Sequence, residues 1–187
     1  MDLDFTPEQD LLRDTVRGIC ERHCNLDVVR KLENDPIGYS PALWTSLAES
    51  RLLGLTIDEK YDGSGMTMLD GVVVYEEFGR TLVSTPHFVS AVLAAGLISR
   101  SGNDDLKAAW LPKIAAGDAI VTVGSLEPDS SFGTSGIALT ATGDGTGYRL
   151  SGVKRHVPFA GAASHLVVLA RTNDTRDADG IIAVLVE

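Results

Sequence analysis

The sequence has few cysteines, no long apolar segment and no excess of positive charge. Two cysteines among 187 residues cannot define a disulfide framework. No apolar run reaches the roughly 20 residues that a membrane-spanning helix needs. The formal net charge of -10 argues against non-specific nucleic-acid binding. The acidic first ten residues lack the pattern of a signal peptide. We therefore expect a cytoplasmic protein with no membrane span.

The two cysteines lie four residues apart in a segment with helical spacing. Cys20 and Cys24 would then share one face of a helix, with His23 between them. These three residues could be metal ligands, but a fourth ligand and the C-x-x-C spacing are missing. We expect small buried thiols and no metal site.

Short motifs of nucleotide and hydrolase chemistry are also absent. No Walker motif, G-x-S-x-G elbow or H-E-x-x-H sequence occurs. The glycine-rich stretch 143–147 does not fit G-x-G-x-x-G and precedes a strand, so we interpret it as a hairpin connection.

The first two thirds of the sequence predict helices. Thr6, Pro7 and Gln9 form a helix start with a capping box. Segment 85–100 has almost no polar face, which predicts a central helix buried on all sides. A shorter helix is expected near the end of this region, and Pro112 should kink or restart it. Further helix starts are expected at Ser40 and Thr67.

Short β-type runs separated by glycine-rich turns follow Gly117. The order of elements predicts an α+β fold, with an all-helical bundle over 1–118 and part of an antiparallel β-barrel or sandwich over 119–187. The sequence stops on a predicted strand, which would leave an open sheet edge. We therefore expect the front part of a longer protein. The runs are 119–123, 137–142, 148–151, 166–171 and 181–186.

A basic cluster and a proline precede the apolar run 166–170. Val157 and Pro158 should not lie inside a central strand, because proline lacks the backbone donor. The backbone must bend between Pro158 and the next strand. Such a bend faces a ligand in some proteins and is only a connection in more of them.

Seven short motifs stand in the order and spacing typical of the acyl-CoA dehydrogenases, and the sequence resembles that family over essentially its whole length. The resemblance implies the helical domain and the first part of the middle β-domain of such an enzyme. The motifs are Tyr61–Gly65, Tyr75–Arg80, Ser101–Asp104, Trp110–Pro112, Ala116–Asp118, Leu126–Pro128 and Gly152–Lys154.

This resemblance implies an FAD-dependent α,β-dehydrogenation of an acyl-CoA thioester. A carboxylate removes the proton next to the thioester carbonyl, while the β-carbon passes a hydride to the flavin. In the family the base is a glutamate of a carboxy-terminal domain, so no catalytic residue is expected in this chain, Glu127 included. An electron-transfer flavoprotein or similar acceptor is an implied partner. A homo- or hetero-oligomer, dimer or tetramer, is implied as well.

Two segments resemble the motifs that form the flavin wall in this family. They are 125–133 and 154–160, and they contain unusual residues. Leu126 and Pro158 replace flavin-bonding threonines, each hydroxyl being worth about 1 kcal/mol. His156 replaces a tryptophan that packs on the flavin. The implied FAD-binding residues are Ser125, Leu126, His156, Val157 and Pro158.

The resemblance also implies residues that face the acyl-CoA. Val89, Ser90 and Leu93 would line the acyl pocket, or they would simply be core residues. Phe132 replaces a serine that commonly meets the substrate. The basic residues 154–156 would bind the phosphates of CoA, or they would form a charged strand end at the surface.

Two other functions use the same scaffold. One is a non-catalytic structural subunit of a heteromeric acyl-CoA dehydrogenase. The other is a flavin monooxygenase or oxidase.

Overall fold

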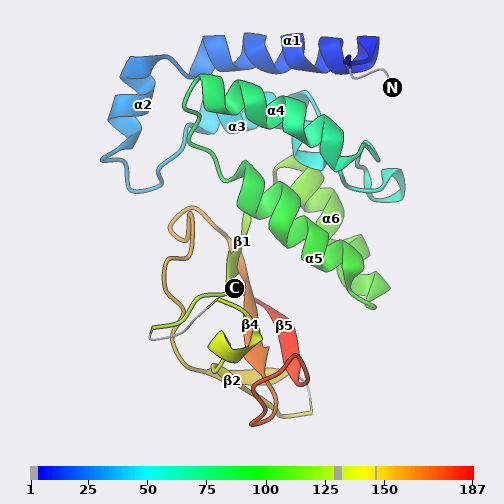
Figure 1. The fold of residues 1–187 in the computed structure, drawn as a ribbon, viewed down its shortest axis with the longest axis vertical. Helices are drawn as coiled ribbons and strands as arrows, with labels where there is room; N and C mark the ends of the chain where they lie inside the picture. Colours follow the sequence, from blue (N-terminus) through cyan, green and yellow to red (C-terminus); the bar gives the residue numbers. More distant parts are fainter. Residues whose placement is uncertain (1–3, 129–131, 146) are drawn as a thin grey trace.

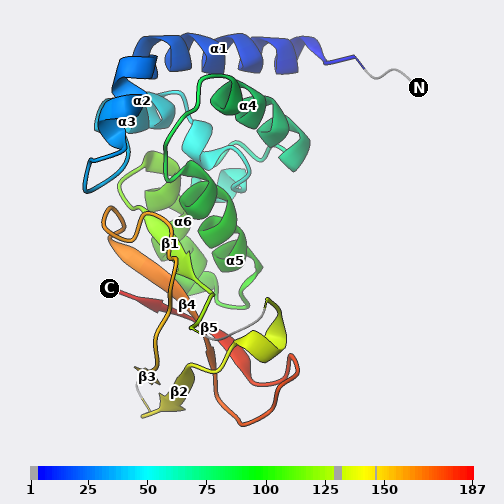
Figure 2. The same ribbon diagram turned by 60° about the vertical axis from the view of Figure 1, so that its left-hand side comes forward.

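The computed structural model describes residues 4–128, 132–145 and 147–187. The α-helices lie at one end of the molecule and the strands at the other, as both views show, and a short 3₁₀ helix (Thr134–Gly136) lies among the strands (Figures 1 and 2). This arrangement confirms the predicted α+β fold. The helices are α1 (Pro7–His23), α2 (Leu26–Leu32), α3 (Pro41–Glu49), α4 (Met68–Arg80), a π-helical segment (Phe88–Ala94), α5 (Ala95–Arg100) and α6 (Asp104–Ala116). The strands are β1 (Val121–Gly124), β2 (Thr140–Gly143), β3 (Tyr148–Ser151), β4 (His165–Arg171) and β5 (Ile181–Val186).

The start of α1 has the predicted capping box. The Thr6 hydroxyl accepts from the Gln9 N–H at 3.2 Å, and the Gln9 side chain accepts from the Thr6 N–H at 3.1 Å. Both cysteines at the other end of α1 are buried free thiols, as predicted. None of the helices in the described residues combines the length and apolar character that a membrane crossing requires.

The segment predicted as a fully buried central helix is helical but is not buried on all sides. The π-helical segment and α5 together cover most of it. Val89, Ser90 and Ile98 are buried, whereas Phe88 and Leu93 are 46% and 41% exposed. The prediction was wrong on this point because neighbouring elements pack on one side of the helix and leave an apolar stripe open.

Helix α6 runs through Pro112 as one element, so the restart that was one of the two expected effects of Pro112 does not occur. Asn103 caps its start, and Gly117 ends it with a φ of 80°. Proline removes one backbone hydrogen bond, but Leu111 and Ile114 on either side of it are fully buried. Their packing keeps the helix continuous.

The sheet is mixed, with neighbouring strands in the order β1-β4-β2-β3 and β5 paired with β4. The β2–β3 and β4–β5 pairs are antiparallel, as predicted. The β1–β4 pair is parallel, and β2 meets β4 in parallel at one position. The prediction of an antiparallel sheet was therefore wrong for the pairs that β4 forms with β1 and β2. A long connection leads from β1 to β4, and such a connection allows two strands to pair in parallel, which a hairpin does not.

One apolar cluster joins the helical layer to the sheet. It contains Ala95 and Ile98 of α5, Ile114 of α6, Val121 of β1 and Val167 of β4. Elements on both sides of residue 118 share this core. The division into domains 1–118 and 119–187 stays a prediction.

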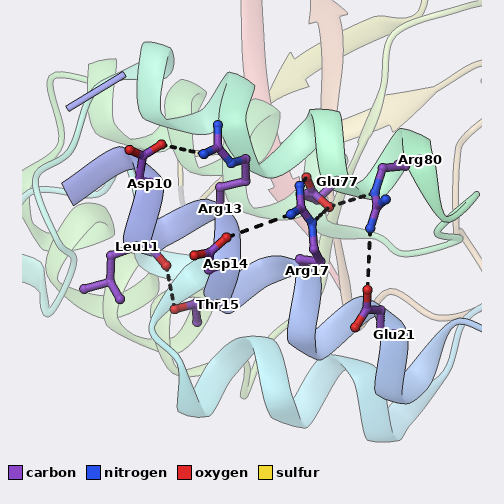
Figure 3. A network of polar contacts seen from close by, with 9 residues as sticks. All are labelled: Asp10, Leu11, Arg13, Asp14, Thr15, Arg17, Glu21, Glu77 and Arg80. Atoms are coloured by element: carbon purple, nitrogen blue, oxygen red, sulfur yellow. Dashed lines mark hydrogen bonds and ion pairs between the residues drawn. The ribbon is translucent and has the colours of Figure 1, made fainter. Parts of the chain in front are cut away.

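A buried carboxylate connects α1 and α4 (Figure 3). Glu77 is 3% exposed and accepts two hydrogen bonds from Arg17, at 2.7 and 3.1 Å, and one from Arg80 at 3.1 Å. The hydrogen bond from Arg17 is the main reason that the pKa of Glu77 lies below its usual value. The network fixes α1 on α4, and nothing in the local sequence pattern predicts it.

Candidate flavin-facing surface

The two segments predicted to face the flavin lie side by side. The Arg155 N–H donates to the Leu126 carbonyl oxygen at 2.8 Å. The Thr122 hydroxyl, in β1, donates to the Pro158 carbonyl oxygen at 2.6 Å. These bonds hold the segments that contain Ser125, Leu126, His156, Val157 and Pro158 against each other and against β1. We call the segments 125–127 and 154–158 the wall.

The bend that precedes β4 has a restricted backbone. Val157 and Pro158 lie outside any strand, as predicted. His156 and Phe159 have φ values of 50° and 52°, in the left-handed region that non-glycine residues seldom adopt. Strained residues of this kind concentrate at functional sites. The side chain of His156 is exposed, and that of Val157 is half-buried.

A buried ion pair lies behind the wall. The Lys154 ammonium contacts a Glu127 carboxylate oxygen at 2.6 Å and the Ser125 carbonyl oxygen at 3.3 Å. The Lys154 and Glu127 side chains are only 6% and 10% exposed. This burial disfavours the reading of Lys154 as a phosphate ligand, whereas Arg155 and His156 are exposed. This pair was not predicted from the sequence.

The charge state of Glu127 reflects two opposing influences. Burial raises the pKa of Glu127. The hydrogen bonds from Lys154 and from the Leu139 and Ala138 N–H groups lower this pKa, and together they outweigh the effect of burial. The net pKa lies below the usual value, so the group is a carboxylate at neutral pH. The donors from Lys154, Ala138 and Leu139 already engage this buried carboxylate, and the expectation that Glu127 is not the base stays a prediction.

The wall also offers a backbone donor. Among the described residues, no group accepts a hydrogen bond from the Leu126 N–H. In the second wall segment, the imidazole of His156 is exposed and the side chain of Val157 is half-buried. Neither Leu126 nor Pro158 supplies the hydroxyl of a threonine at its position. The surface can therefore bind a flat polar ring through backbone groups and packing.

The residues predicted to face the acyl-CoA have different environments. Val89 is buried, and the fully buried Ser90 hydroxyl accepts a hydrogen bond from the Val121 N–H at 3.1 Å. Leu93 belongs to the exposed apolar stripe, and Phe132 is 89% exposed. Part of the first wall motif, residues 129–131, lies outside the described residues. Substrate contact by these side chains stays a prediction.

Comparison with known proteins identifies the family to which the chain belongs. The acyl-CoA dehydrogenase N-terminal domain family matches residues 6–118, more than half of the chain. The chain belongs to the acyl-CoA dehydrogenase family, as its motifs predicted.

Individual relatives agree with this assignment. Acyl-CoA dehydrogenase FadE27 of Mycobacterium tuberculosis is 30% identical over 92% of this chain and 45% of its own length. The ChsE4-ChsE5 complex of the same organism is 28% identical, with a TM-score of 0.85, over all of this chain and 48% of that chain. Butyryl-CoA dehydrogenase of Megasphaera elsdenii is 25% identical, with a TM-score of 0.87, over all of this chain and 50% of its own. The chain thus spans about half the length of these relatives.

Proposed function

We propose that this chain is the amino-terminal part of an FAD-dependent acyl-CoA dehydrogenase subunit and that it supplies one wall of the flavin site. The observation that carries this proposal is the junction of the two segments that resemble the flavin-wall motifs. They are far apart in the sequence, yet the bonds of Arg155 and Thr122 hold them together. A preformed surface of this kind binds a cofactor without first having to be ordered.

In this proposal the protein binds the flavin mainly through its backbone. The Leu126 N–H would donate to a ring acceptor, and the exposed His156 imidazole would pack on the ring. Ser125, Val157 and Pro158 would complete the surface. FAD would supply the hydride acceptor, and the protein would hold the ring in place.

The acyl-CoA would enter along the exposed apolar stripe of the helical layer. Leu93 is accessible there, and Phe132 is accessible near the end of segment 125–133, which resembles the first wall motif. Val89 would shape the pocket from within the core. Ser90 would act indirectly, since its hydroxyl holds the start of β1.

In the family the base is a glutamate of a carboxy-terminal domain, so we expect no turnover from this chain alone. A structural subunit of a heteromeric dehydrogenase is the second candidate. The observation that favours it is the loss of two hydroxyl donors, at Leu126 and Pro158. The ChsE4-ChsE5 complex is also among the similar solved structures. An electron-transfer flavoprotein as acceptor and a cytoplasmic location remain part of the proposal.

The visible absorption spectrum of the purified full-length protein tests the proposal. It should be recorded for the protein alone and after co-expression with a partner subunit, followed by anaerobic addition of acyl-CoA. If the protein alone shows flavin bands that acyl-CoA bleaches, it is a catalytic subunit. If the flavin bands appear only after co-expression with the partner, the role of a structural subunit is supported. Preparations without flavin in either case contradict the proposal.

A further inference from the structure

Lys154 and Glu127 come from the two different segments of the wall, and their side chains meet behind it. We infer that this pair positions the flavin-facing backbone, so that its loss weakens cofactor binding although neither side chain touches the cofactor. The inference rests on the proposed flavin site. It assigns a positioning role to two wall residues for which the sequence predicted no such role.

The placement of Lys154 is specific. Its ammonium donates to Glu127 and to the Ser125 carbonyl oxygen, so one group fixes the backbone on both sides of Leu126. The lysine stem also passes close to Gly124. A Cβ atom at that position would lie 3.3 Å from Cγ of Lys154, which is closer than such contacts normally are. The missing side chain at residue 124 makes room for the lysine.

Glu127 extends the contact away from the wall. Its carboxylate accepts from the Ala138 and Leu139 N–H groups at 3.0–3.2 Å. Arg171, which is 5% exposed, holds the same segment from the other side by donating to the Ile137 carbonyl oxygen at 2.8 Å. A continuous polar path therefore runs from the wall to β4.

Arg171 connects this path to the loop that joins β4 and β5. Its guanidinium also donates to the carbonyl oxygens of Thr134, Asp177 and Asp179, at 2.8–3.0 Å. Every donor of this buried arginine has an acceptor, which makes it a rigid anchor. The Lys154–Glu127 pair thus ties the wall to a fixed part of the sheet.

The low exposure of both side chains distinguishes positioning from direct binding. A group of which 6% or 10% is exposed has little surface left for a flavin or a CoA phosphate. Replacing Lys154 with an apolar residue would leave the Glu127 carboxylate buried without its countercharge. The structure would relax by moving segment 125–127, and the Leu126 N–H would lose its orientation.

The test is FAD affinity in the full-length protein, with its partner if the flavin requires one, measured by fluorescence quenching. Lys154→Met should weaken FAD binding at least tenfold, and Lys154→Arg should recover part of the loss. Arg149, exposed in β3 and outside the wall, gives a matched control, and Arg149→Met should bind FAD within twofold of the parent. The shape of the flavin absorption bands should also change in Lys154→Met. A variant that is only less stable, but still folded under the assay conditions, would not show this change.

The double variant Lys154→Met/Glu127→Gln keeps the test decisive if the single variant does not fold. Removal of both charges should restore folding but not full FAD affinity. If Lys154→Met binds FAD as tightly as the parent, the inference is wrong and the proposed function still stands. The same holds for the double variant if only that variant folds. A parent protein that binds no FAD under any of these conditions overturns both.

Discussion

The hydroxyl of Thr122 donates a hydrogen bond to the carbonyl oxygen of Pro158, 36 residues away, at 2.6 Å. This bond attaches the bend to Thr122, a fully buried residue of β1. It lies two residues from His156, whose left-handed backbone needs support from its surroundings. The bend is therefore a fixed surface of the sheet and not a free connection between strands.

Replacing Thr122 with valine tests how much this bond contributes. Thr122→Val keeps the branched shape but removes the donor, so the protein should lose about 1 kcal/mol of stability, together with some FAD affinity. Chemical denaturation and an FAD titration measure the two effects. Thr142→Val, at an exposed position in β2, is the control and should change neither quantity. If Thr122→Val changes neither the stability nor the FAD affinity, the bend keeps its shape without this hydrogen bond.

The ion-pair network of Glu77 should stabilise the helical layer. Glu77→Gln removes the charge that both Arg17 and Arg80 contact, and we expect a loss of about 2 kcal/mol in the free energy of unfolding. Its exposed neighbour gives a matched control, since Glu76→Gln should change stability by less than about 0.5 kcal/mol. Denaturant titration of both variants measures the difference. Equal stabilities for the two would contradict the role assigned to Glu77.

His87 should make stability depend on pH. It is 2% exposed, its Nδ1 contacts the Tyr75 hydroxyl at 2.8 Å, and its Nε2 contacts the Leu52 carbonyl oxygen at 3.1 Å. Burial lowers its pKa from 6.5 to about 4, so the folded protein favours the neutral ring. Burial also raises the pKa of Tyr75, which keeps the phenol protonated as a donor to His87.

The sign of the effect follows from this difference in pKa. Below pH 6.5 the unfolded chain binds a proton at His87 that the folded chain does not, so stability falls as the pH drops toward about 4. The expected loss is about 3 kcal/mol. Subtracting the denaturation curves of His87→Gln, which has no titrating ring, isolates this contribution from that of the carboxylates. Parallel pH profiles for parent and variant would disprove it.

A substitution at Ser90 tests whether this residue lines the acyl pocket or belongs to the core. Because its hydroxyl accepts from the buried Val121 N–H, Ser90→Ala should cost about 1–2 kcal/mol of stability. The acyl-CoA affinity of the full-length protein should change by less than twofold. Ser99→Ala, at an exposed position of α5, should leave both unchanged. A large loss of acyl-CoA affinity at normal stability would place Ser90 in the substrate pocket.

Local chemistry predicted many of the elements. The cap formed by Thr6 and Gln9 depends on residues three positions apart, and it was found where expected. The turn between β2 and β3 follows in the same way from a short glycine-rich sequence. Such features need no knowledge of distant parts of the chain.

Long-range relationships were not predictable from these patterns. The parallel β1–β4 pair and the Arg17–Glu77 contact join residues more than 40 positions apart. The continuity of α6 through Pro112 depends on tertiary packing, and so does the exposed stripe around Leu93. At the wall, the sequence identified the two segments but not the Lys154–Glu127 pair that joins them.

The most direct test of the central proposal is the FAD affinity of the His156→Gly variant of the full-length protein. Glycine suits the left-handed backbone at this position, so the fold should be retained or gain stability while the packing face is lost. His156→Trp should bind FAD more tightly if the surface has room, and Pro158→Thr should have a smaller effect. The proposal predicts that His156→Gly binds FAD several-fold more weakly than the parent at equal or greater stability. Equal FAD affinity would show that the flavin does not lie against this wall.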